Sequence, residues 1–140
     1  MPIDERWDHL TSSDWEAFAG AWLAELRGAP GSPDSDVGQS VVMMNFTARP
    51  QHQWQFVRAA VSQAKSGEEL GHIAAGPMEH LMGWHGADYI EAVETQAASD
   101  PKFAHMLAGV WKYMMNDEVW ERVQTLKRRY PFSSGPEADA

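Results

Sequence analysis

The 140-residue sequence has no cysteine, and no apolar run approaches the roughly 20 residues that a membrane-spanning helix requires. The absence of cysteine excludes disulfide bonds, thiolate zinc sites and a cysteine nucleophile. The first residues, MPIDERWDHL, are charged and unlike the apolar core of a signal peptide. We therefore expect a cytoplasmic protein that does not enter the membrane.

Basic residues are also scarce, because 11 Lys and Arg stand against 20 Asp and Glu and the formal net charge is −9. Residues 66–100 contain no Lys or Arg at all. Nucleic-acid backbones are held by Lys and Arg, so this charge pattern argues against direct nucleic-acid binding. It is compatible with a basic protein partner, because complementary charge steers association.

The N-terminal part of the chain carries helical signals. Ser13 and Glu16 have the spacing of a capping box, and Gly28 ends a stripe of apolar residues at helical spacing, which consists of Trp15, Phe18, Ala19, Trp22 and Leu26. Residues 28–39 are rich in Gly, Pro, Ser and Asp, which predicts a flexible loop. The run SVVMMNF (40–46) fits a short helix or a lone strand, and we assign a helix because its neighbours are helical.

Further helices are predicted along the rest of the chain. Pro50 lies near a helix start, Asp100 precedes Pro101 as a cap, and Asn116 caps the last helix. The apolar stripes are Trp54, Val57, Val61 and Ala64; Tyr89, Ile90, Val93 and Ala97; Phe103, Leu107, Val110, Trp111 and Met114; and Val119, Val123 and Leu126. These signals predict an all-α fold, an irregular bundle or a short stack of six to seven antiparallel helices. We expect a single domain over residues 1–132 and a disordered tail over residues 133–140.

The stretch GHIAAGPMEHLMGWHG (71–86) gathers histidines, a glutamate and a Gly-Pro pair. As architecture, Gly76 is an N-cap and Pro77 is the first helical residue. Glu79 then stands where its carboxylate bonds the free N–H of the cap and complements the helix dipole. His85, followed by glycine, resembles a helix end. We prefer this interpretation because it accounts for the glycine, the proline and the glutamate together.

A catalytic or metal site in the same stretch is the alternative. Glu79 beside His80, with His85 and Asp88, would supply acid–base groups. His72, His80 and His85 would supply metal ligands, although they are eight and five residues apart and match no zinc signature. We expect no cofactor.

The tryptophans are the other candidates for function. Trp111 and Trp120 are expected to pack across the last pair of helices. Trp54 and Trp84 are less firmly placed, and either one, if exposed, becomes a candidate for partner binding, because Trp is enriched at binding hot spots. The nearby acids Asp88, Glu91 and Glu94 complete the expected partner-binding set.

Three segments carry a family resemblance: IAAGPMEHLMGWHG (73–86), DPKFAHMLAGVW (100–111) and MNDEVWERVQ (115–124). In order and spacing they resemble the pattern A-G-P-L-E-D-L-L, H-G, G-V-W and D-x-V-W-x-R-V-Q of a bacterial domain-of-unknown-function family of small helical proteins. The likeness covers about residues 48–129. The chain departs from the pattern at His80, where Asp usually follows the glutamate, which argues against adjacent carboxylates binding a metal. The resemblance implies no reaction, substrate or cofactor.

Two functional hypotheses follow from the sequence. The first is a non-catalytic, acidic, helical binding protein, in its concrete form an immunity- or antitoxin-type protein that covers a basic partner, or a homo-oligomeric scaffold. The second is a small metal-binding or hydrolytic enzyme that uses Glu79, His80 and His85. The absence of a catalytic motif favours the first hypothesis.

Overall fold

The computed structural model describes residues 2–28 and 36–131, and all of its regular elements within these ranges are helical. The all-α prediction is confirmed. A 3-10 helix η1 (Glu5–His9) is followed by α1 (Ser12–Leu26), α2 (Val37–Thr47), α3 (Pro50–Gln63), α4 (Gly67–Ile73), the π-helical turn η2 (Ala74–Met78), α5 (Glu79–Ser99), α6 (Pro101–Leu107) and α7 (Asp117–Arg129).

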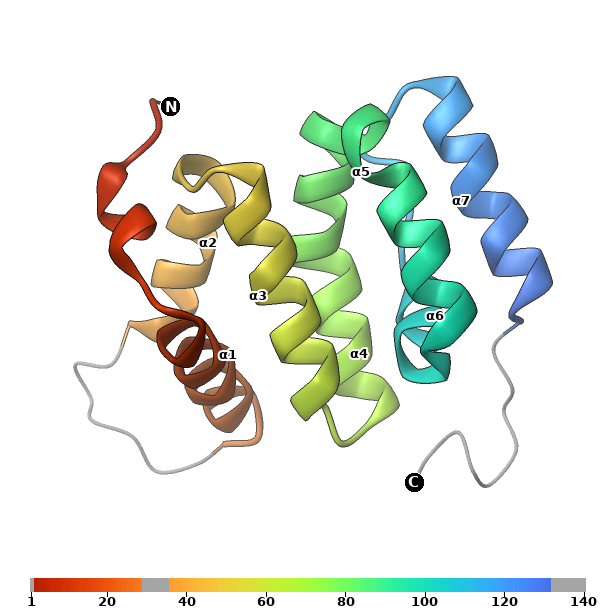
Figure 1. Ribbon diagram of the computed structural model, residues 1–140. Helices are drawn as coiled ribbons and strands as arrows, with labels where there is room; N and C mark the ends of the chain where they lie inside the picture. The colour runs from red at the N-terminus through yellow and green to blue at the C-terminus, as the bar shows by residue number, and fades with distance from the viewer. Residues whose placement is uncertain (1, 29–35, 132–140) are drawn as a thin grey trace.

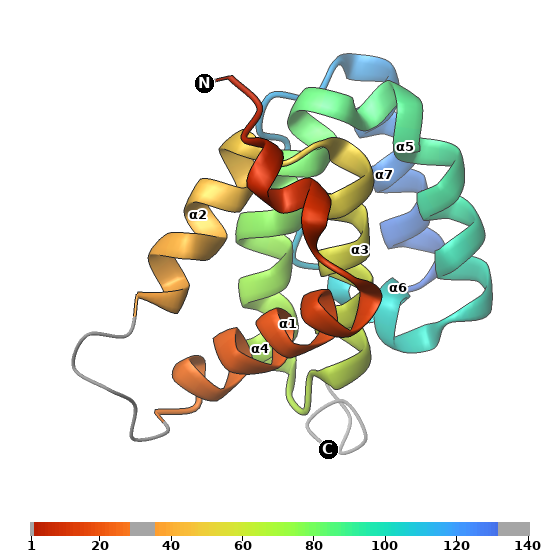
Figure 2. The same cartoon turned by 60° about the vertical axis from the view of Figure 1, so that its left-hand side comes forward.

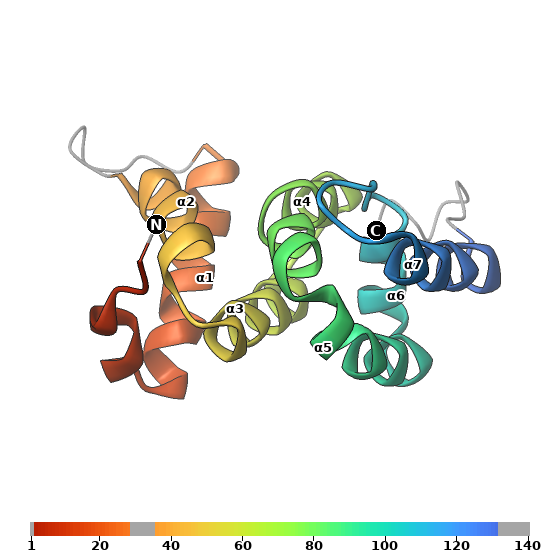
Figure 3. The ribbon, with the colours of Figure 1, turned by 90° about the horizontal axis from the view of Figure 1, so that it is seen from above.

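The helices form a row in which neighbours run up and down the molecule. Figure 1 shows these neighbours side by side in the order α2, α3, α4 with the start of α5, the rest of α5, and α7. Helix α1 crosses α3 at one end of the row. Seen from above, successive members of the row alternate between two layers (Figure 3). No helix within the described ranges is long and apolar enough to cross a membrane.

The segment predicted as a loop is shorter than expected, because residues 37–39 belong to α2. Val37 packs against the core, and the Gly38 N–H donates to Glu25 Oε1 at 3.2 Å, so the helix starts earlier than the composition suggested. The remaining loop residues 29–35 and the predicted tail 133–140 lie outside the described residues. The assignment of residues 40–46 as a helix is confirmed.

The capping box of helix α1 starts two residues earlier than the predicted one. Thr11, not Ser13, is the N-cap, and its Oγ1 accepts from the Asp14 N–H at 3.1 Å. The Asp14 carboxylate in turn accepts from the Thr11 N–H at 2.9 Å. The prediction was wrong because two overlapping pairs have the same spacing, and the pair that starts at Thr11 leaves Trp15 buried in the first turn.

The core consists of the predicted apolar stripes. Trp15, Phe56 and Phe103 are fully buried, and the ring of Trp15 lies edge-on to Phe56 at 6.4 Å between centroids. A partly buried ion pair ties the end of α1 to α4, because Arg27 donates twice to the Glu69 carboxylate at 2.8 Å. Figure 2 shows the N-terminal segment lying across the upper ends of α2 and α3, where the Asp4 N–H donates to the Thr47 carbonyl at 2.9 Å.

Candidate binding surface

The Gly-Pro pair does not start a helix, contrary to the prediction. Helix α4 continues into α5 through the π-helical turn η2, with Pro77 inside the turn, and the Glu79 N–H bonds to the Ala74 carbonyl five residues earlier. A π-type turn widens the helix by one residue and so accommodates the N–H that proline lacks. Gly76 is therefore not an N-cap, and Glu79 does not cap a helix.

The predicted helix end at His85 is a kink inside α5. His85 has non-helical backbone angles (φ −134°, ψ 19°), and the helix turns there and runs back down the molecule (Figure 1). Gly86 is buried, and a Cβ at this position would lie 2.8 Å from Val119 Cγ1 on α7. The glycine is thus required by the close approach of α5 and α7 and not by a helix cap.

Glu79 anchors the connection between α6 and α7. Its Oε2 accepts from the Trp111 backbone N–H at 3.1 Å. Burial raises the pKa of Glu79, while the Trp111 hydrogen bond and the Lys127 charge act in the opposite direction. Lys127 approaches the same connection from α7, because its Nζ donates to the Val110 carbonyl at 2.8 Å and lies 4.6 Å and 5.4 Å from the ring centroids of Trp111 and Trp120. Two helices therefore hold this connection in place.

His80 is part of a row of rings and has no acidic partner. Its ring lies edge-on to Phe46 of α2, with centroids 4.6 Å apart, and its centroid is 5.4 Å from that of Tyr113. Burial lowers the pKa of His80, and its buried Nδ1 has no hydrogen-bond partner among residues 2–28 and 36–131. Burial at this position therefore favours the neutral form of the imidazole.

The residues of the enzyme and metal alternatives do not assemble into one site. His72 is exposed in the last turn of α4, His80 is half-buried between aromatic rings, and His85 lies at the kink. Within the described part of the chain, no three His, Asp or Glu side chains are placed to hold a metal ion. Glu79 faces the connection before α7, and Asp88 is exposed on α5.

Exposed apolar residues come from the elements that meet at His80, which are α2, α5 and the connection before α7. We call this surface the aromatic face and define it as Phe46 from α2, His80 and Trp84 from α5, and Trp111, Tyr113 and Met114 from the connection. Trp84 follows His80 by one helical turn and so shares its side of the helix. A Cβ on Gly83 would lie 3.1 Å from Tyr113 and Met114, so the absence of a side chain there lets the connection approach α5.

The exposure of Trp111 corrects one expectation from the sequence. Trp111 was predicted to pack in the core, but 67% of it is exposed, the highest value among the large apolar residues of the described chain. Helix α6 ends at Leu107, so Trp111 and Met114 no longer follow the helical stripe that begins at Phe103. Trp120 is partly buried against the core.

The two tryptophans proposed for partner binding have different environments. Trp84 is 56% exposed. Trp54 is partly buried, lies edge-on to Phe103 at 5.6 Å between centroids, and carries the Arg58 guanidinium 5.5 Å from its ring centroid. Trp54 is therefore a packing residue, whereas the side chain of Trp84 is free to contact a partner.

Carboxylates follow Trp84 along α5 beyond the kink. We call Asp88, Glu91 and Glu94 of α5, together with Glu118 of α7, the acidic band. Glu94 accepts from Arg122 Nε at 3.0 Å, and Glu94, followed by Glu91 and Glu118, raises the pKa of Arg122. Asp88, Glu91 and Glu118 are exposed and form no ion pair with another described residue. The band thus carries more negative charge than the Arg122 cation matches.

A second polar cluster, which the sequence did not predict, lies near the N-terminus. His52 Nε2 is 2.9 Å from Asp8 Oδ1, and Arg49 Nε donates to both Asp8 oxygens at 3.1 Å. Burial opposes the ionised form of Asp8, but Arg49 and His52 outweigh it and lower the Asp8 pKa. The His52 ring stacks on Trp15 at 5.5 Å, so the cluster fastens η1 to α3.

Comparison with known proteins identifies the family of the chain. Residues 34–130 match the model of a family of unknown function, DUF6869, so the chain belongs to this family. The match confirms the expected domain-of-unknown-function family and extends it to include α2. No curated protein and no solved structure matches the chain.

Proposed function

We propose that this member of a family of unknown function is a non-catalytic binding protein that holds a basic protein partner on its aromatic face and acidic band. The observation that carries the proposal is the exposure of Trp84, Trp111, Tyr113 and Met114, which are 56%, 67%, 47% and 54% exposed. Soluble proteins rarely gather large apolar side chains in this way outside an interaction site. Trp and Tyr are also the residues that most often dominate binding energy.

The backbone that carries the aromatic face is fixed by hydrogen bonds, which supports a preformed binding surface. The connection that carries three of its residues is held by Glu79 at the Trp111 N–H and by Lys127 at the Val110 carbonyl. A preformed surface loses little conformational entropy when a partner binds. Little of the free energy gained by burying apolar surface is therefore offset by ordering the connection, and most of it contributes to the affinity for the partner.

Charge complementarity selects a basic partner. The formal net charge is −9. The exposed carboxylates of Asp88, Glu91 and Glu118 form no ion pair with another described residue, and the Arg122 charge that Glu91 and Glu118 interact with is already paired with Glu94. Such carboxylates attract Lys and Arg from solution and repel acidic proteins. The specific form that we propose is an immunity- or antitoxin-type protein that covers a basic surface of its target.

Affinity capture with the tagged full-length chain, from an extract of the organism that produces it, tests this proposal. We expect one stoichiometric partner with an excess of Lys and Arg, whose retention falls as salt rises. Trp84→Ala combined with Tyr113→Ala should weaken binding by about 10- to 100-fold, as expected for two hot-spot residues. The matched control is Arg58→Ala, an exposed change on α3.

Charge-reversal variants distinguish the contribution of the acidic band to the affinity from that of the aromatic face. Asp88→Lys with Glu91→Lys should reduce both the affinity and its salt dependence, whereas Glu16→Lys with Glu68→Lys, which reverses two exposed acids elsewhere, should leave the affinity nearly unchanged. A partner held equally by all variants, or no stoichiometric partner, would contradict the proposal. A dimer in light scattering that Trp84→Ala dissociates would show instead that a second copy covers this face.

A further inference from the structure

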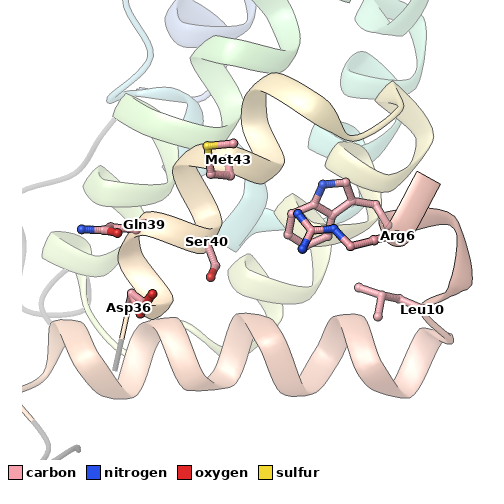
Figure 4. Close-up of a pocket in the computed structure, with 7 residues that line it drawn as sticks. Arg6, Leu10, Asp36, Gln39, Ser40 and Met43 are labelled. Atoms are coloured by element: carbon pink, nitrogen blue, oxygen red, sulfur yellow. The ribbon is translucent and has the colours of Figure 1, made fainter. Parts of the chain in front are cut away.

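A cavity of about 300 Å³ lies between η1 and α2, on the other side of α2 from its contacts with the core (Figure 4). Its apolar walls are Trp7, Leu10 and Met43. Its polar wall is a single stripe of α2, formed by Asp36, Gln39 and Ser40. Asp36 and Ser40 are four residues apart, so their side chains share one side of the helix, whereas the Gln39 amide points away from Leu10 and Arg6 (Figure 4).

The aromatic wall of the cavity is rigid. Trp7 Nε1 donates to Thr47 Oγ1 at 2.8 Å, and the Trp7 ring stacks on Phe18 with centroids 5.8 Å apart and an angle of 19° between the planes. Thr47 Oγ1 donates in turn to the Met43 carbonyl at 2.6 Å. A ligand therefore meets a tryptophan that is already fixed, in a cavity at the lower end of the size range of small-molecule sites.

The charge of the cavity is negative. Arg6 lies at its rim, but the Arg6 guanidinium is bound to Asp4 at 2.7 Å and 2.8 Å, so its charge is already matched. Asp36 occupies the N-cap position of α2 without making a capping hydrogen bond. Within the described chain the side chains of Asp36 and Ser40 make no hydrogen bond to another residue, which leaves a carboxylate and a hydroxyl as unused acceptors on one wall.

We propose that this cavity binds an alkylammonium group, that is, a primary amine on an aliphatic or aromatic body. An ammonium has three N–H donors and no acceptor, which matches the carboxylate of Asp36 and the hydroxyl of Ser40. The apolar body lies against Trp7, Leu10 and Met43, where it loses contact with water. The site is separate from the aromatic face and does not depend on the proposed function.

The ammonium group has two possible sources, a free amine and a lysine side chain, and the experiment distinguishes them. The full-length protein, labelled with ¹⁵N, is titrated at low salt with n-hexylamine, with the isosteric 1-hexanol and hexanoate, and with Nα-acetyl-lysine N-methylamide. We expect hexylamine to shift the Trp7 indole N–H and the amides of residues 37–43. It should bind about 10-fold more tightly than hexanol, because the charge-assisted hydrogen bond to Asp36 is absent with the alcohol. Hexanoate should bind most weakly.

The affinity of the lysine derivative distinguishes the two possible sources of the ammonium group. Binding equal to that of hexylamine assigns the site to a lysine side chain of a peptide, and clearly weaker binding assigns it to a free amine. Equal binding of hexylamine and hexanol, or shifts confined to other parts of the protein, would overturn the proposal.

Asp36→Asn provides the matched variant, because asparagine is also favoured at the N-cap and the fold is preserved. It should reduce the preference for hexylamine over hexanol by about 3- to 10-fold. Asp88→Asn, a neutralised acid on α5, should leave this preference unchanged. If Asp36→Asn also leaves it unchanged, the carboxylate does not bind the amine and the proposal is wrong.

Discussion

Replacing Gly86 with alanine tests how α5 packs against α7 at the kink. The new Cβ would lie 2.8 Å from Val119 Cγ1, whereas carbon atoms in favourable contact are about 3.5–4.0 Å apart. Val119 is buried and β-branched, so it has essentially one side-chain rotamer in a helix and cannot turn away. The two helices must therefore separate, at a cost of about 1–3 kcal/mol.

Gly86→Ala also increases helix propensity, and a control variant measures the stability that this increase contributes. Alanine is favoured over glycine in a helix by about 1 kcal/mol. Gly71→Ala, in α4, places a Cβ with no atom within 4 Å and should show this gain alone. We therefore expect Gly86→Ala to be about 1–3 kcal/mol less stable than Gly71→Ala in urea denaturation, which corresponds to a difference in Tm of roughly 3–15 °C.

A double-mutant cycle isolates the steric contact. Val119→Ala removes both γ-carbons near the new methyl group, so in this background Gly86→Ala should become neutral or stabilising. The coupling energy should be about 1–3 kcal/mol. Equal stabilisation by Gly86→Ala and Gly71→Ala, with additive effects in the cycle, would refute the close approach of α5 and α7.

Three further predictions concern the core, an ion pair and the connection before α7. Phe103→Ala should lower the free energy of unfolding by about 3–5 kcal/mol, because its side chain is fully buried. Trp111→Ala should lower it by about 1 kcal/mol or less, because this side chain is exposed. Equal losses of the two variants in urea denaturation would refute the assignment of Trp111 to the surface. The hydrogen bond from Arg27 lowers the pKa of Glu69 in the folded protein, so its stabilisation is present above the unfolded pKa and is lost as pH falls through the folded pKa. Glu69→Gln should therefore be less stable than the wild type near about pH 6, and the gap in denaturation midpoint should close toward about pH 3; a gap that widens on acidification would contradict this sign. Lys127→Met should accelerate amide hydrogen exchange in the connection with little change in global stability, and unchanged exchange there would show that the lysine does not hold it.

Most of the fold could be predicted from the sequence because apolar spacing and caps are local signals. The stripe of α7, its Asn116 cap and the Asp100–Pro101 start of α6 are found where the sequence places them. The Gly76–Pro77 pair was interpreted wrongly because proline normally ends a helix. Whether a π-type turn accommodates the missing N–H depends on the helices that pack around it.

The aromatic face was predicted only in part. Trp84 was a candidate, but Phe46 and Tyr113 were not singled out, and Trp111 and Met114 were placed on the apolar stripe that begins at Phe103. Two signals point to them in retrospect: VVMMNF is apolar on more than one side of its helix, and GVWKYMM runs from Gly109 to the cap of α7 without a helical stripe. Which of these residues is exposed depends on where α6 ends, and helix ends are weakly encoded.

Site-specific photo-crosslinking tests the central claim most directly. A photoreactive amino acid is placed at position 84 or at position 113, both on the aromatic face, or at position 58 on α3 as the control, and irradiated in an extract of the producing organism. We expect positions 84 and 113 to capture the same protein, one rich in Lys and Arg, and position 58 to capture nothing comparable. Capture of that protein only from position 58, or of an acidic protein from position 84, would contradict the account.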